Sequence, residues 1–107
     1  MAERKDPLAD CTGFDWDDGN THKNWVLHRI SPEEAEQVFL NEPLIVRIDV
    51  RHSRLEKRYY ALGKTSSRRY LFVAFTIRQL LVRVISVRDM NRRERVAYAK
   101  REENADT

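Results

Sequence analysis

The sequence has little of what exported and membrane proteins need. Cys11 is its only cysteine, so no disulfide can form within the chain, and a reducing cytoplasm is the expected compartment. The first residues, MAERKDPLADCT, lack an apolar signal-peptide core, and nowhere do about eighteen apolar residues follow one another. We therefore predict a soluble cytoplasmic protein without a membrane partner.

The sequence also lacks the common catalytic signatures. No Gly-x-Ser-x-Gly motif, plausible Cys and His pair or pair of catalytic carboxylates is present, which excludes acyl-transfer chemistry. The stretch LGKTSS resembles the end of a phosphate-binding loop, but that loop needs a second glycine where Arg58 stands. A hairpin loop that requires Gly63 is the better interpretation.

The three histidines form no pattern of metal ligands. His22 and His28 are six positions apart on a predicted helix, and no cysteine or carboxylate completes a ligand set. We predict no metal and no cofactor. His52 lies in a polar turn between basic strands, where a phosphate contact is plausible.

Charge is divided unevenly along the chain. Residues 1–46 hold four Lys or Arg against ten Asp or Glu, whereas residues 47–107 hold sixteen against seven. A small domain with this division has a basic face that can attract a polyanion, although solvated charge alone also accounts for it.

Local signals predict three helices and four strands. Ser31, Pro32 and Glu34 form a helix start with a capping box, and Asn91 with Glu94 repeats the box. Asp17 or Asp18 can cap the first helix. We expect helices at 20–28, at 32–40 and from Asn91 onward, and strands at 44–50, 56–62, 70–77 and 80–87.

These elements predict an α+β domain. Two N-terminal helices and one C-terminal helix pack on a four-stranded antiparallel sheet, and Phe14 and Trp16 belong to a short strand or extended arm before it. We expect a flexible polar leader at 1–12, a single domain at 13–103, and a frayed tail at 104–107, with fraying from Glu102 onward.

Two arginines stand out because they interrupt apolar strands. Burying the guanidinium of Arg83 in LLVRVISV, and less clearly that of Arg58 in EKRYYAL, costs desolvation free energy unless an anion pairs with it. That anion is either a protein carboxylate or a phosphate. The carboxylates considered for Arg83 are Glu56, Asp89 and Glu94.

Several ordered stretches together resemble the BrnT family, the toxins of bacterial type II toxin–antitoxin pairs. They are GFDWDDGNTHKNWVLHRISPEEAEQVFLNEP, RYYALGKTSSRRYLFVAFTIR and VRVISVRDMNRRERVAYAK, which span about Gly13 to Lys100. The resemblance implies a compact RelE-like fold and a metal-independent ribonuclease that arrests translation and growth. It also implies a BrnA-like antitoxin, a 2:2 complex, and binding of operator DNA through the antitoxin.

The resemblance also implies functional positions. They are Arg58, Arg78, Arg83, Arg88, Arg92, Arg93 and Glu94. Together with the sequence reasoning, this predicts a catalytic set of Arg58, Arg83, Arg88 and Glu94 and an RNA-binding set of Arg78, Arg92, Arg93, His52 and Lys64. Two departures from the family pattern are Asn20 in place of an early helix lysine and Arg29 in place of a glycine. A third is Phe75 in place of a tyrosine.

RNA supplies its own nucleophile, the 2′-hydroxyl. Cleavage therefore needs positioning, proton transfer and cations facing the pentavalent phosphate, a task for which arginine is suited. Arg83 and Arg58 are expected there, with Arg88 fixing the backbone. Glu94, His52 and Lys64 are hypotheses for the general acid or base. Two rival interpretations are a noncatalytic basic module that binds an antitoxin or nucleic acid, and a RelE-fold toxin that inhibits a protein target.

Overall fold

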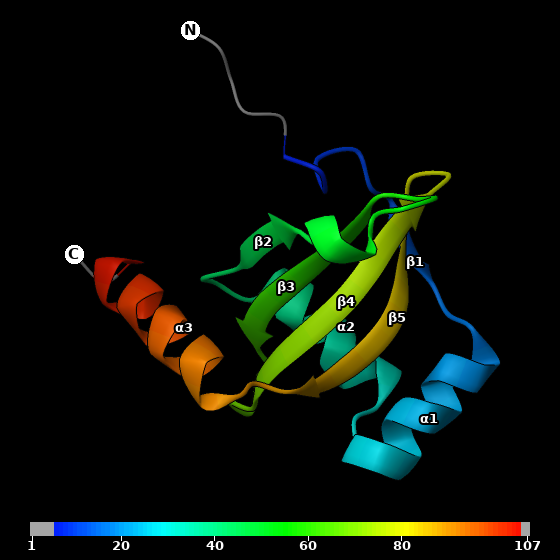
Figure 1. The fold of residues 1–107 in the computed structure, drawn as a ribbon. Coiled ribbons are helices and arrows are strands. Elements are labelled where there is room, and N and C mark those ends of the chain that lie inside the picture. Colours follow the sequence, from blue (N-terminus) through cyan, green and yellow to red (C-terminus); the bar gives the residue numbers. More distant parts are fainter. Residues whose placement is uncertain (1–5, 106–107) are drawn as a thin grey trace, which may run out of the picture.

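A computed structural model describes residues 6–105 and shows an α+β fold of three helices and one mixed sheet (Figure 1). Residues 1–5 of the predicted leader and residues 106–107 of the predicted tail lie outside the described residues. The helices are α1 (Asp18–His28), α2 (Pro32–Leu40) and α3 (Arg92–Ala105). The strands are β1 (Gly13–Asp15), β2 (Ile45–Ile48), β3 (Arg58–Lys64), β4 (Tyr70–Arg78) and β5 (Leu81–Asp89), with a 3-10 turn η1 at Val50–His52.

The prediction of a four-stranded antiparallel sheet was wrong in one respect. The sheet has five strands in the order β1-β5-β4-β3-β2, and β1 pairs with β5 in parallel, Asp15 opposite Arg83. β1 is the segment that was expected to be a short strand or an arm. It joins the sheet because Thr12, just before it, donates a backbone hydrogen bond to the Leu80 carbonyl at 2.8 Å.

The helices begin where the predicted caps stand. The Ser31 hydroxyl accepts from the Glu34 amide at 3.2 Å, while the Glu34 carboxylate accepts from the Ser31 amide at 3.1 Å. The Asn91 side chain and Glu94 exchange the same two bonds. Asp17, the first of the two candidates, caps α1. α3 continues through 104 and 105, beyond the position at which fraying was expected.

One face of the sheet holds the main core. Its buried side chains come from α2, β3, β4 and β5, and Figure 1 shows α2 behind these strands. Gly63 explains how closely α2 approaches. Gly63 lies within β3 rather than in a hairpin loop. Glycine is needed at this position because a β-carbon would stand 2.6 Å from Val38 Cγ1. The role predicted for Gly63 was therefore wrong.

The opposite face is only partly covered. α3 packs over one end of it through Tyr98, which is buried with Ile45, Leu62 and Met90 and donates a hydrogen bond to the Pro43 carbonyl at 2.6 Å. The other end of this face, near the β4–β5 turn, has no α-helix over it, and only the short η1 segment lies near it (Figure 1). That turn is tight, as predicted, and Gln79 and Leu80 both adopt positive φ.

Candidate functional site

A row of polar side chains crosses the uncovered end of the sheet. Arg58 on β3 lies opposite Thr76 on β4, Thr76 lies opposite Arg83 on β5, and Arg83 lies opposite Asp15 on β1. Residues directly opposite each other share a face, and their β-carbons are about 5 Å apart. Two guanidinium groups predicted from separate strands therefore stand on either side of one threonine.

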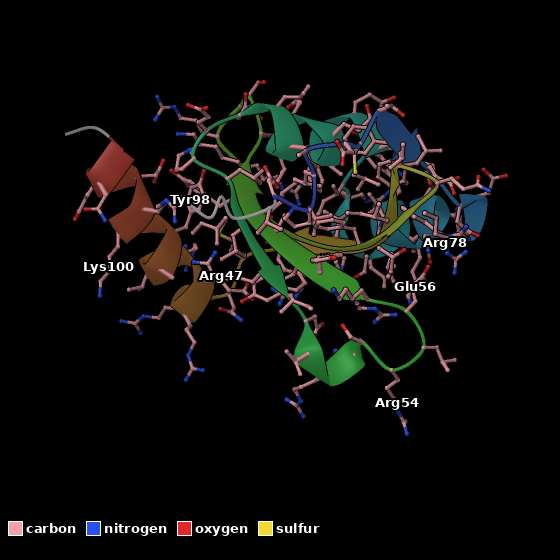
Figure 2. The ribbon with its side chains drawn as sticks, turned by 90° about the horizontal axis from the view of Figure 1, so that it is seen from above. Arg47, Arg54, Glu56, Arg78, Tyr98 and Lys100 are labelled. Atoms are coloured by element: carbon pink, nitrogen blue, oxygen red, sulfur yellow. The ribbon has the colours of Figure 1, made fainter. Side chains whose placement is uncertain are left out.

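This row forms the floor of a cavity of about 590 Å³. The segment between β2 and β3 forms its wall, and Figure 2 shows Arg54 at the outer end of this segment, with Glu56 and Arg78 closer to the sheet. The residues that line the cavity are Arg51, His52, Arg54, Leu55, Glu56, Arg58, Thr76, Arg78, Arg83 and Ile85. Five arginines face one carboxylate, so the cavity is suited to an anion.

Ile85 lies in the cavity because the β4–β5 ladder is irregular. Ala74 pairs with Ser86 and Phe75 with Val84, which leaves Ile85 as an extra residue on β5. Such a bulge redirects side chains beside it. It places an apolar side chain next to the arginines.

Arg83 is held by two carboxylates that were not predicted. Its Nη1 lies 3.4 Å from Asp15 Oδ2 and its Nη2 lies 3.7 Å from Asp17 Oδ2. None of the three expected carboxylates pairs with it. The reason is the position of β1, which brings the acidic N-terminal stretch beside β5. Both contacts are long and partly exposed, so they orient the guanidinium and leave it able to face an anion.

The three carboxylates expected beside Arg83 each bind another arginine. Glu56 pairs with Arg78, Asp89 with Arg69, and Glu94 with Arg88.

Arg58 combines a fixed backbone with an available side chain. Its amide donates to Ser53 Oγ at 2.9 Å, and its carbonyl accepts from the Asp49 amide at 2.7 Å. Within residues 6–105 its guanidinium has neither a hydrogen bond nor an ion pair. Five N–H donors on an anchored strand are therefore available to a ligand.

Arg78 and Glu56 close the rim of the cavity. The Arg78 Nε and Nη2 donate to the two Glu56 oxygens at 2.7 and 3.0 Å. The hydrogen bond from Arg78 lowers the pKa of Glu56, with smaller contributions from the charges of Arg78, Arg83 and Arg58. Glu56 is thus a carboxylate at neutral pH, and its partner Arg78 is already engaged.

His52 forms a pair with Asp49 at the mouth of the cavity. Its Nδ1 lies 2.9 Å from Asp49 Oδ2, and its side chain is 60% exposed. A carboxylate next to Nδ1 favours the tautomer with the proton on that nitrogen, which leaves Nε2 as the acceptor. The Nε2 atom of His52 can therefore accept a proton from a ligand in the cavity.

Four of the nine predicted site residues meet in this cavity: His52, Arg58, Arg78 and Arg83. The other five lie elsewhere. Arg88 donates two hydrogen bonds to Glu94 at 2.8 and 2.9 Å and stacks on the Phe72 ring, 4.0 Å from its centroid. Lys64 pairs with Glu102 on α3 at 2.9 Å. Arg92 and Arg93 are exposed in the first turn of α3.

The sequence reasoning missed several contributors to the cavity. They are Arg51, Arg54, Thr76 and the two aspartates beside Arg83. Thr76 is buried, and its hydroxyl finds no hydrogen-bond partner among the described residues. The one available signal was a polar residue near the end of the apolar run YLFVAFTI, in a strand that is otherwise apolar.

The described residues contain neither a metal-ligand cluster nor a membrane span. Within residues 6–105, no group of three His, Cys, Asp or Glu side chains could hold a metal ion. No helix in the same range has the length and apolar character needed to cross a bilayer.

Comparisons with known proteins show a matching family and similarity to a solved structure. The family model described as "Ribonuclease toxin, BrnT, of type II toxin-antitoxin system" matches residues 16–94. The fold is similar to the crystal structure of the Brucella abortus ribonuclease toxin BrnT, with a TM-score of 0.55 and 18% sequence identity. That similarity covers 75% of this chain and 97% of the Brucella chain. Comparison with curated protein sequences finds no match.

Proposed function

Because the chain belongs to the BrnT family of ribonuclease toxins of type II toxin–antitoxin systems, we propose that it is a metal-independent endoribonuclease. It cleaves RNA through the substrate's own 2′-hydroxyl and thereby arrests translation and growth. A BrnA-like antitoxin neutralises it in a 2:2 complex that binds operator DNA through the antitoxin. The observation that carries the ribonuclease proposal is the arginine-lined cavity over the Arg58, Thr76 and Arg83 row.

The cavity suits a phosphodiester in its transition state. When the 2′-oxygen attacks phosphorus, negative charge grows on the nonbridging oxygens. Fixed donors aimed at that charge lower the barrier. Arg58 and Arg83 flank Thr76 on rigid strands, and both stay ionised at any physiological pH. We assign them the task of binding the pentavalent phosphate, while Arg51 and Arg54 bind neighbouring phosphates.

His52 is the general base in this proposal. Its Nε2 takes the proton of the 2′-hydroxyl, the new bond from the 2′-oxygen to phosphorus forms, and the bond from phosphorus to the 5′-oxygen breaks. The departing 5′-oxygen takes a proton from water, and the products are a 2′,3′-cyclic phosphate and a 5′-hydroxyl. Asp49, bonded to Nδ1, stabilises the imidazolium that forms.

The other predicted residues have supporting parts. Arg88 and Glu94 bind each other at the start of α3, so the proposal gives them no proton transfer and no phosphate. Arg92 and Arg93 are exposed on the same helix and extend the basic surface for RNA. Lys64 is engaged by Glu102 at the far end of β3, away from the cavity.

Cleavage of a labelled single-stranded RNA in EDTA tests the proposal. We expect the wild type to cleave, and Arg83→Ala to cleave about 100- to 1000-fold more slowly, the usual effect of removing one such donor. The matched control is Arg68→Ala. Arg68 is exposed in the turn before β4, whereas Thr76 lies near the other end of that strand. Circular dichroism verifies that all three proteins fold.

The alternatives give different results in the same assay. Cleavage that stops in EDTA would refute metal independence. RNA binding without cleavage would favour the noncatalytic module, and growth arrest with intact RNA would favour a protein target. An Arg83→Ala protein as active as Arg68→Ala would remove Arg83 from the site. His52→Gln should slow cleavage about 100-fold or more while RNA binding is kept, and an unchanged cleavage rate would exclude His52 as the base.

A further inference from the structure

β2 is an edge strand of the sheet. Among residues 6–105 it pairs only with β3 and ends the sheet order, and the only hydrogen bond on its outward side is the one that the Val46 carbonyl accepts from Arg47. The Asp49 amide donates to the Arg58 carbonyl at 2.7 Å, continuing the register in which Arg47 faces Tyr60 and Ile45 faces Leu62. Antiparallel strands alternate between bonded and non-bonded residues. The intervening residues, Val46 and Ile48, therefore direct their N–H and C=O groups away from the sheet.

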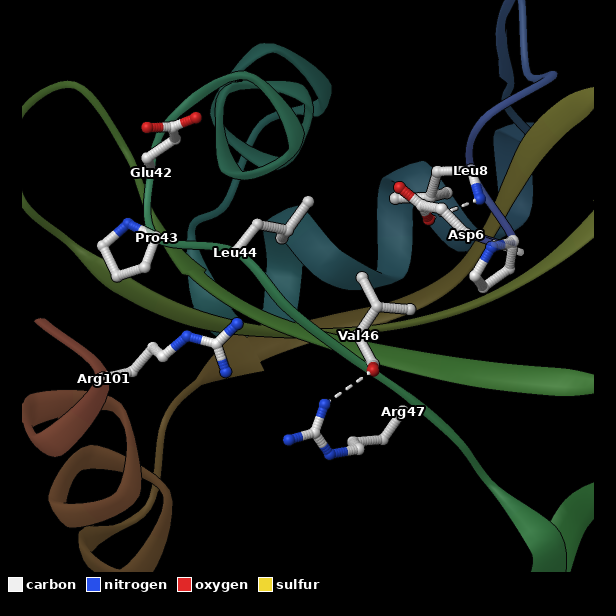
Figure 3. Close-up of a pocket in the computed structure, with 9 residues that line it drawn as sticks. Asp6, Leu8, Glu42, Pro43, Leu44, Val46, Arg47 and Arg101 are labelled. Carbon is white, nitrogen blue, oxygen red and sulfur yellow. Dashed lines mark hydrogen bonds between the residues drawn. The ribbon is translucent and has the colours of Figure 1, made fainter. Parts of the chain in front are cut away.

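A cavity of about 480 Å³ lies beside this edge (Figure 3), and it shares no lining residue with the cavity over the arginine row. The start of the chain forms one wall through Asp6, Pro7 and Leu8, and the last turns of α3 form another through Arg101. Figure 3 shows β2 passing between these walls, with the Val46 carbonyl accepting a hydrogen bond from the Arg47 side chain at 3.0 Å. An extended segment placed here would run along the strand.

The two sides of the edge differ in character. On the side of the main core, Leu8, Leu44 and Val46 offer aliphatic surface, and Ile48 is 45% exposed. On the α3 side stand the exposed guanidinium groups of Arg47 and Arg101. Among the described residues Arg101 has no hydrogen bond or ion pair, and Arg47 bonds only its neighbour's carbonyl.

We infer that β2 accepts a sixth strand, supplied by a partner protein as an extended segment in which aliphatic and acidic residues alternate. Because successive side chains of a strand point to opposite faces, the aliphatic residues contact Leu8 and Ile48. The acidic residues lie between Arg47 and Arg101. The inference does not depend on ribonuclease activity.

Other occupants fit less well. Exposed main-chain donors and acceptors along an edge match the backbone of an extended peptide, which RNA does not have. A second copy of this chain paired through β2 would bring Arg47 close to the Arg47 of its partner, and like charges across a strand pair are destabilising. The other sheet edge, β1, has only three residues and carries Asp15.

Amide hydrogen exchange and titration with a defined peptide test the inference. The probe is a short, terminally capped peptide of alternating valine and glutamate, added to the full-length protein. We expect slowed exchange of the Val46 and Ile48 amides. Ile48→Pro removes one outward N–H without removing a β2–β3 hydrogen bond, so binding should weaken about tenfold, while Ile48→Val should bind as the wild type does.

Two further arms keep the result interpretable. If Ile48→Pro does not fold, N-methylation of the peptide's β2-facing amides removes the complementary hydrogen bonds, which the peptide donates to β2 carbonyls, and should also weaken binding. Replacing glutamate with lysine should weaken binding to the wild type and favour a protein with Arg47→Glu and Arg101→Glu. Peptide binding that leaves the β2 amides unprotected would overturn the inference. So would equal affinity for both peptides, displacement by single-stranded RNA, or protection caused by self-association alone.

Discussion

The contact between Gly63 and α2 gives a stability prediction whose size follows from two distances. A β-carbon on Gly63 would lie 2.6 Å from Val38 Cγ1 and 3.1 Å from the Val38 carbonyl oxygen. Carbon atoms pack best at about 3.5 to 4.0 Å, so Gly63→Ala requires a shift of about 1 Å between strand and helix. Both Val38 and the neighbouring Ala35 are fully buried, which leaves no empty space for this shift.

Overpacking of a dense core costs about 1 to 3 kcal/mol. We expect Gly63→Ala to lower the free energy of unfolding by that amount, or the melting temperature by about 4 to 8 °C for each kcal/mol. Val38→Ala should cost about 2 kcal/mol through lost burial. Because it removes the nearer of the two clashing atoms, the double variant should be at least about 1 kcal/mol more stable than the two single effects predict.

Urea unfolding followed by circular dichroism measures all three variants. Gly13→Ala is the matched control, since a β-carbon there meets only Leu81 Cδ2, at 3.5 Å. It should change stability by less than about 0.5 kcal/mol. A Gly63→Ala protein as stable as the control, or a double variant whose loss equals the sum of the single losses, would refute the close contact as the reason for glycine.

Three shorter predictions use the same unfolding assay. Thr76→Val removes a buried hydroxyl without a partner among the described residues, and should raise stability by about 1 kcal/mol; a loss would indicate a hydrogen bond. Asn and Gly adopt positive φ angles more readily than Gln79 and Leu80. The double variant Gln79→Asn with Leu80→Gly should therefore raise the free energy of unfolding by about 1 kcal/mol, and no gain would contradict the two positive φ angles. Burial raises the pKa of Glu94, but Arg88 and the Asn91 amide together lower it below 4.5. The contribution of the Glu94 carboxylate to stability is therefore complete above pH 4.5, and it is lost as the pH falls through the lowered pKa. Glu94→Gln should be less stable than wild type at pH 7 and equal to it in acid, and a gap that persists in acid would contradict this.

The parts of the fold that local chemistry determines could be predicted from the sequence. The capping boxes of Ser31 with Glu34 and of Asn91 with Glu94 join residues three positions apart, so the pattern contains the whole interaction. The four longer strands were visible for a related reason, since each is a run of β-branched or aromatic residues. β1 was expected only as a short strand or an arm. Its parallel pairing with β5 was not expected, because three residues are too few for a pairing pattern and their partner strand lies far along the chain.

The candidate site shows the same limit. A charged residue inside an apolar strand marked Arg83 and Arg58 as unusual, and both line the cavity. The register that aligns them with Thr76 arises from strand pairing, which no single stretch encodes. The carboxylates beside Arg83 could not be chosen correctly without knowing that β1 lies next to β5.

The parallel pairing of β1 with β5 also sets when the cavity can be completed during synthesis. Translation delivers the N-terminal segment first, yet Asp15 must wait for Arg83, which follows it by 68 positions. β1 has no strand to join until β5 has been synthesised. A nascent chain that stops before β5 lacks both Arg83 and Ile85, so the ribosome making this protein is not exposed to an assembled cavity until most of the chain has been translated.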